Sequence, residues 1–208
     1  EDGDILQVID ERRITLEYYK NGILHFAVCA SLLAAAVGAV CVARPGLPPP
    51  SAPDDPAVTH LFQLQILLFR YEFTLDPEVS AQALQARATA ALARYGALTP
   101  DGTQVGDPAL LAELAGLTRN FADSYLLVLR AARGLRSRDI PVDDLPRRIQ
   151  EVGRGLLAVD ELRRPEALSI ENIRNAVTAF REEGVLQVKV GGGGLQFDDT
   201  AHAQYTAD

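Results

Sequence analysis

The feature that most constrains this chain is the uncharged run Ile23–Ala43, which holds 21 residues without Asp, Glu, Lys or Arg. As a helix it would be about 31 Å long, close to the thickness of the apolar core of a bilayer. However, seven of these residues are alanine, which adds little to the free energy of membrane insertion. We therefore expect a helix that is buried in protein or lies on the membrane surface, with a single membrane span as the alternative.

Small residues recur along this run. Ala30, Ala34 and Gly38 stand four residues apart, so on a helix they would form one smooth face, here called the small-residue face. Such a face allows close contact with a second helix, in soluble cores as well as in membranes. We expect it to touch another helix, either of this chain or of a second domain.

Polar side chains precede the small-residue face. Tyr18, Asn21 and His25 stand at positions i, i+3 and i+7, which a helix would place in one line, here called the polar stripe. A buried stripe of this kind needs hydrogen-bond partners. From the residues alone, a histidine satisfied inside the core is the favoured interpretation of His25, and a neighbouring domain or a ligand is the alternative.

A proline-rich stretch marks the clearest boundary, because prolines in series form a stiff, exposed linker. We expect a lead-in and long apolar helix over 1–44, a linker over 45–57, a helical domain over 58–198 with hairpins near 97–105 and 185–197, and a tail over 199–208.

Start and stop residues divide the region after the linker into helices. Asp76-Pro77 and Asp107-Pro108 each join an N-cap aspartate to a proline at the first helical position. Gly96 is a typical helix stop. With 48% hydrophobic residues the chain can bury a sizeable core. Together these signals predict a mainly α protein, a helical bundle with one or two small β-hairpins.

Composition argues against several classes of function. The net charge of −8 disfavours nucleic-acid binding, because neutralising phosphates needs a basic face. Cys29 and Cys41 would lie about 18 Å apart on one helix, too far for a disulfide. The three histidines have no metal-site spacing, and the glycines at 191–194 lack the lysine of a phosphate-binding loop. We therefore expect no metal and no cofactor.

Several segments resemble one protein family, in the same order along the chain. They are residues 16–25 (Leu-Glu-Tyr-Tyr-Lys-Asn-Gly-Ile-Leu-His), 67–73, 121–131, 163–169 and 180–185. They resemble the region beyond the catalytic domain in large, membrane-bound bacterial glycerol-3-phosphate 1-O-acyltransferases. The resemblance spans roughly residues 5–190. The chain also contains no methionine, so we expect it to be a piece or a processed product of a longer protein.

The resemblance implies acyl transfer to the 1-hydroxyl of glycerol 3-phosphate, a step of phospholipid synthesis that yields lysophosphatidate. In that family a histidine acts as general base and an aspartate five positions later orients it. Here His25, His60 and His202 are followed at that distance by alanine, glutamine and alanine. We therefore expect no catalytic residue in this chain and no activity of the chain alone.

The resemblance also implies the partners. They are the N-terminal catalytic domain of the same protein, the membrane surface, and acyl-CoA or acyl-carrier protein through the whole enzyme, with no nucleic acid. The expected location is the cytoplasmic face of the cell membrane, peripheral or monotopic, with a single span as the alternative. The polar stripe and the small-residue face then become the candidate interface with the catalytic domain.

Two other classes of function stay open at this point. Residues 169–183, followed by two strands joined through 191–194, also match the recognition helix and wing of a winged-helix DNA-binding protein. Arg174 and Arg181 are that helix's only basic residues, against Glu171, Glu182 and Glu183, so DNA would be repelled. The other alternative is a standalone helical protein-interaction module.

Overall fold

Helices account for most of the structure, a computed structural model that describes residues 24–43, 53, 55–135, 140–188 and 195–197. The elements are α2 (Val28–Ala43), α3 (Pro56–Leu68), η1 (Phe69–Tyr71), α4 (Ala81–Tyr95), α5 (Pro108–Gly116), α6 (Arg119–Leu135), α7 (Leu145–Ala158), η2 (Pro165–Leu168), α8 (Ile170–Glu182), β1 (Leu186–Val188) and β2 (Leu195–Phe197). The symbols η1 and η2 denote short 3-10 helices. The chain is mainly α, which confirms the predicted fold class.

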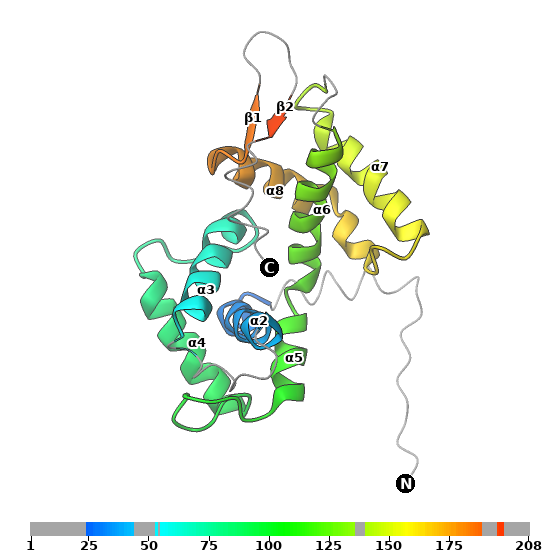
Figure 1. Cartoon of the computed structure of the whole chain (residues 1–208). Helices are drawn as coiled ribbons and strands as arrows, with labels where there is room; N and C mark the ends of the chain where they lie inside the picture. Colours follow the sequence, from blue (N-terminus) through cyan, green and yellow to red (C-terminus); the bar gives the residue numbers. More distant parts are fainter. Residues whose placement is uncertain (1–23, 44–52, 54, 136–139, 189–194, 198–208) are drawn as a thin grey trace.

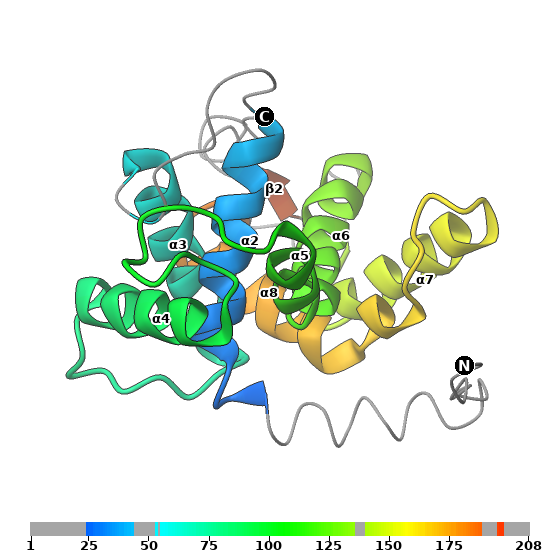
Figure 2. The same cartoon turned by 90° about the horizontal axis from the view of Figure 1, so that it is seen from below.

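Helix α2 lies at the centre of one group of helices and packs against α3, α4 and α5 (Figures 1 and 2). It carries no charge, and Leu32, Leu33, Ala34 and Val37 are fully buried. A helix that is apolar on all sides has to be covered on more than one side. Its one deeply buried hydroxyl, on Ser31, is satisfied by a hydrogen bond of 2.9 Å with Thr118.

The uncharged run forms a shorter helix than predicted. Residues 25–27 form a turn, in which the Ala27 N–H bonds to the Leu24 carbonyl three residues back. The regular helix therefore starts at Val28 and has 16 residues. Among the residues that the structure describes, no helix is both long enough and apolar enough to cross a bilayer.

A second group consists of α6, α7, α8 and η2 (Figure 1). Helix α3 belongs to the first group, but it continues into η1, which packs against α8. The buried apolar side chains of both groups form one contiguous core, with Phe62 of α3 at 0% exposure and Phe180 of α8 at 1%. Segment 55–73 therefore joins the two groups.

Most of the proposed linker, 45–57, lies outside the described residues, as do residues 1–23 and the tail. Helix α3 starts inside the linker range, at Pro56, after the N-cap Asp55. The division of the chain into domains stays a prediction.

Two β features accompany the helices. Strands β1 and β2 form an antiparallel pair in which Gln187 lies opposite Gln196. Within the other proposed hairpin, 97–105, Leu98 and Val105 form a single antiparallel bridge. It follows the left-handed Gly96 (φ 86°), which ends α4 as predicted.

The two Asp-Pro pairs that were predicted to start helices, at 76–77 and 107–108, have different roles. Asp107 caps α5 and accepts hydrogen bonds from the N–H groups of Ala109 and Leu110, as predicted. The prediction for Asp76 is wrong, because α4 starts five residues later, with Ser80 as its N-cap. Asp76 instead accepts the N–H of Glu78 within a local turn.

Alanine at each of these two aspartates should therefore lower the free energy of unfolding by a different amount. Asp107→Ala should lower the free energy of unfolding by about 1 kcal/mol, because two N–H groups of α5 lose their acceptor. Asp76→Ala, the matched control, should cost only a few tenths of a kcal/mol. Urea unfolding of both variants measures the difference, and equal losses would contradict the assignment of the caps.

Candidate functional site

Three of the segments that carry the family resemblance meet in one place. Segment 67–73 includes η1, segment 121–131 lies in α6, and segment 180–185 starts at the end of α8. Their aromatic rings contact one another edge to face. The centroid distances are 4.8 Å for Phe69–Tyr125, 4.9 Å for Phe73–Phe121 and 5.7 Å for Tyr125–Phe180. We call this place the η1–α6–α8 junction.

A polar group is enclosed in this junction. The side-chain amide of Asn175, on α8, donates to Glu72 Oε2 at 3.1 Å and to the Tyr71 carbonyl at 3.2 Å. Glu72 Oε1 and the Tyr125 hydroxyl are shielded from solvent, and neither has a hydrogen bond of ordinary geometry to the described residues. Burial raises the pKa of Glu72 to about 7, although Asn175 and Tyr125 partly oppose this shift. Burial, with the Glu72 carboxylate nearby, also raises the pKa of Tyr125.

Charged side chains close the outer edge of the junction. Arg70 lies 2.7 Å from Glu182 and 3.0 Å from Glu183. The Tyr71 hydroxyl donates to Glu182 at 2.5 Å. These bonds, that of Tyr71 first and then that of Arg70, lower the pKa of Glu182. Because the pairs are partly exposed, they add little to stability, but they fix the end of α8 against η1.

The fourth segment, 163–169, packs on the same helix, α6. The Ser124 hydroxyl is buried and lies 2.9 Å from the carbonyl oxygens of Asn120 and Ala167, which share its single proton. Arg164 pairs with Asp123 at 3.1 Å. Segment 121–131, in α6, therefore contacts the other three segments of the resemblance that follow the linker, which are 67–73, 163–169 and 180–185.

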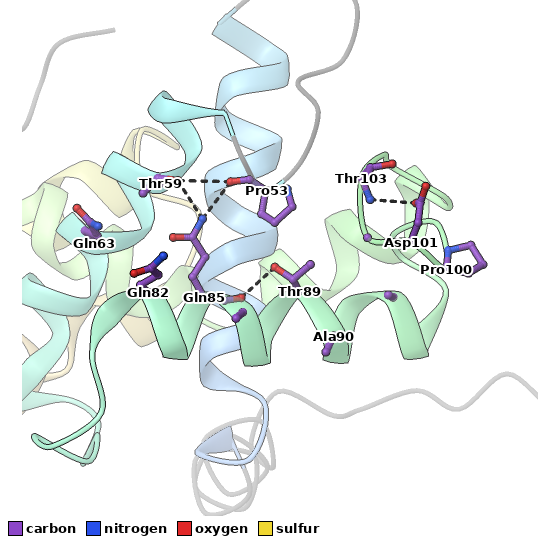
Figure 3. Close-up of a pocket in the computed structure, with 13 residues that line it drawn as sticks. Pro53, Thr59, Gln63, Gln82, Gln85, Thr89, Ala90, Pro100, Asp101 and Thr103 are labelled. Carbon is purple, nitrogen blue, oxygen red and sulfur yellow. Dashed lines mark hydrogen bonds between the residues drawn. The ribbon is translucent and has the colours of Figure 1, made fainter.

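An open groove of about 690 Å³ lies elsewhere, between α3, α4 and the loop at 100–103 (Figure 3). The side-chain amide of Gln85, which lines the groove, donates to the Pro53 carbonyl and to the Thr59 hydroxyl, each at 3.0 Å. Among the described residues that line it, Asp101 is the only charged one. Its carboxylate accepts hydrogen bonds from Thr99 and Thr103, which lower its pKa. The described lining therefore offers a phosphate ligand no cationic side chain.

The candidate interface residues are only partly described. Tyr18 and Asn21 lie outside the described residues, and His25 is exposed, with its ring 3.9 Å from that of Phe26. Ala30 and Ala34 are buried at 3% and 0% exposure in the core of this chain. Gly38 is half-buried, and a Cβ placed there would meet no atom within 4 Å. Contact of these residues with a second domain stays a prediction.

In the winged-helix alternative, α8 would be the helix that binds DNA. Arg174, one of its two basic residues, forms an exposed ion pair with Glu171 at 2.7 Å, so an acidic side chain competes with any DNA phosphate for it. No group of three His, Cys, Asp or Glu side chains that could hold a metal occurs within the described part of the chain. The residues that sequence reasoning missed are Glu72, Tyr125 and Asn175.

The family model for the glycerol-3-phosphate acyltransferase C-terminal region matches residues 1–189 of the 208. The chain belongs to this family. No curated protein and no solved structure matches it. The match confirms the resemblance seen in the sequence, and the η1–α6–α8 junction is therefore part of an acyltransferase C-terminal region. The rest of that acyltransferase is the partner that membership implies.

Proposed function

We propose that this chain is the non-catalytic C-terminal part of a glycerol-3-phosphate 1-O-acyltransferase and that it supports the catalytic domain of the same protein. The match of the family model over residues 1–189 carries the proposal. The whole enzyme would transfer an acyl group from acyl-CoA or acyl-carrier protein to glycerol 3-phosphate and release lysophosphatidate. Since no histidine of this chain is followed by an aspartate at the required distance, the catalytic dyad would lie in the other domain.

The contacts at the junction favour a supporting role. Phe69, Tyr125 and Phe180 pack on one another, and Arg70 binds the end of α8. These side chains hold the three elements of the junction together. A general base has to reach the proton it removes, whereas Glu72 Oε1 is shielded from solvent and its Oε2 is bonded to Asn175.

We further propose that the whole enzyme works at the cytoplasmic face of the cell membrane. Its acyl donors would be cytosolic, and its product would be an amphipathic lipid. The middle of α2 does not offer a membrane-binding surface in this fold, since its side chains are buried against α3, α4 and α5. Within residues 24–43, large apolar side chains are exposed only near the two ends, at Phe26 and Val42, each 81% exposed.

An acyltransferase assay tests the proposal. The purified chain should show no turnover of glycerol 3-phosphate with a long-chain acyl-CoA. The enzyme that contains both the catalytic domain and this region should be active, and its activity should sediment with membranes. Deleting this region should reduce that activity at least tenfold. The matched control is the full enzyme carrying Leu126→Ala, an exposed position. Turnover by the chain alone, or full activity after the deletion, would refute the proposed role.

A further inference from the structure

The Glu72 carboxyl occupies an unusual position for an acidic group. It lies where η1, α6 and α8 meet, in the middle of the segments that carry the family resemblance. Its Oε2 accepts one hydrogen bond, from the Asn175 amide at 3.1 Å. Its Oε1 is shielded from solvent and has no hydrogen bond of ordinary geometry to the residues described. An ionised carboxylate has about four acceptor sites, and the two neutral side chains beside this one, Asn175 and Tyr125, cannot fill them all.

No cation compensates this carboxyl within the described structure. The nearest candidate along the chain is Arg70, whose guanidinium binds Glu182 and Glu183 at 2.7 and 3.0 Å. From η1, Tyr71 directs its hydroxyl to Glu182. From α6, the group that faces Glu72 is Tyr125, which is neutral and only 3% exposed. From α8, the facing group is the neutral amide of Asn175.

These surroundings fit a carboxylic acid better than a carboxylate. A buried charge without a partner is costly, whereas a protonated carboxyl is neutral and gains an O–H donor. That donor can serve the Tyr125 hydroxyl oxygen, which also has no hydrogen bond of ordinary geometry among the described residues. We propose that Glu72 takes up a proton when η1 docks on α8, so that closure of the η1–α6–α8 junction depends on pH.

The raised pKa of Glu72 sets the direction in which stability changes with pH. Burial raises the pKa of Glu72 from 4.5 to about 7 in the folded chain. The folded state therefore holds the proton more tightly than the unfolded state. The stability that this proton contributes is fully present below pH 4.5, falls as the pH rises towards 7, and stays constant above that. One proton changes the unfolding equilibrium constant by at most about tenfold per pH unit.

The neutral, nearly isosteric variant Glu72→Gln isolates this effect. The unfolding constants of wild type and Glu72→Gln would be measured in urea at pH 5, 6, 7 and 8. The unfolding constant of the wild type divided by that of Glu72→Gln should rise at least tenfold from pH 5 to pH 7 and then level off. Glu182→Gln is the control, because Glu182 sits on the exposed edge of the same junction and its pKa is lowered. This control should keep the wild-type dependence between pH 5 and 7.

A direct titration gives a second, independent measurement. The side-chain carboxyl carbon of Glu72, labelled with 13C and assigned through its backbone, should titrate in the wild-type chain with a midpoint between pH 6 and 8. A midpoint below pH 5.5, or a flat ratio in the unfolding series, would overturn the proposal. Both measurements use the 208-residue chain and no acyltransferase assay, so their outcome is separate from that of the proposed function.

Discussion

Phe180→Ala should lower the free energy of unfolding by about 3–5 kcal/mol, the range for removing a large aromatic side chain from a core. Phe180 is 1% exposed, and its ring centroid lies 5.7 Å from that of Tyr125. Truncation would leave a cavity between α8 and α6. The neighbours cannot fill it easily, because Tyr125 is already held against Phe69 at 4.8 Å. Urea unfolding followed by circular dichroism measures the loss.

A nearby exposed side chain provides the comparison. Leu126 follows Tyr125 on α6 but is 55% exposed. Leu126→Ala should therefore cost less than about 1 kcal/mol, since little apolar area is lost from the interior. Similar losses for the two variants would mean that the junction is not packed as described.

Start and stop residues predicted the bounds of a helix correctly where only one such residue was present. Asp107-Pro108 starts α5, and Gly96 ends α4 with a positive φ. At Asp76 two start signals compete, because Ser80 follows four residues later. Asp76 forms a turn with Glu78, and Ser80 accepts the N–H of Ala83 at 3.2 Å and starts the helix. The Asp-Pro pair alone did not reveal which of the two residues would be the cap.

The junction could not be predicted from periodicity. Helical spacing shows which side of a helix is apolar, but it does not show which helices meet. Arg70 and Glu182 stand 112 positions apart, and Ser124 and Ala167 stand 43 apart. The family resemblance covers these segments in the same order along the chain, without showing which of them are neighbours in space. Their contact became visible only in the fold.

One signal for the enclosed carboxyl was present in the sequence. Glu72 continues the apolar series of Leu61, Leu64, Leu68 and Phe69 at three- and four-residue steps. A charged residue on the apolar side of a helix has to find a partner or become neutral. Its actual partner, Asn175, lies 103 positions away, so the position indicated a buried group but could not identify its environment.

Gly106→Ala should lower the free energy of unfolding by about 1–3 kcal/mol, the usual cost of overpacking. A Cβ at Gly106 would lie 2.8 Å from the Gly96 carbonyl oxygen and 3.0 Å from the carbonyl carbon and oxygen of Leu98. All of these are backbone atoms, so no side chain can turn away to make room. The shift would also strain the hydrogen bond from the Gly106 N–H to the Ala97 carbonyl, 3.0 Å long.

Gly116 offers a matched control for the same substitution. It is the last residue of α5, it is exposed, and a Cβ there would meet no atom within 4 Å. Gly116→Ala should raise the free energy of unfolding by about 0.5–1 kcal/mol, because alanine loses less backbone entropy than glycine in a helix. Opposite signs for the two variants in urea unfolding would support close packing of Gly106 on residues 96–98. A stabilised Gly106→Ala chain would contradict this packing, because the added methyl group would then have found room beside Leu98 in the turn between α4 and α5.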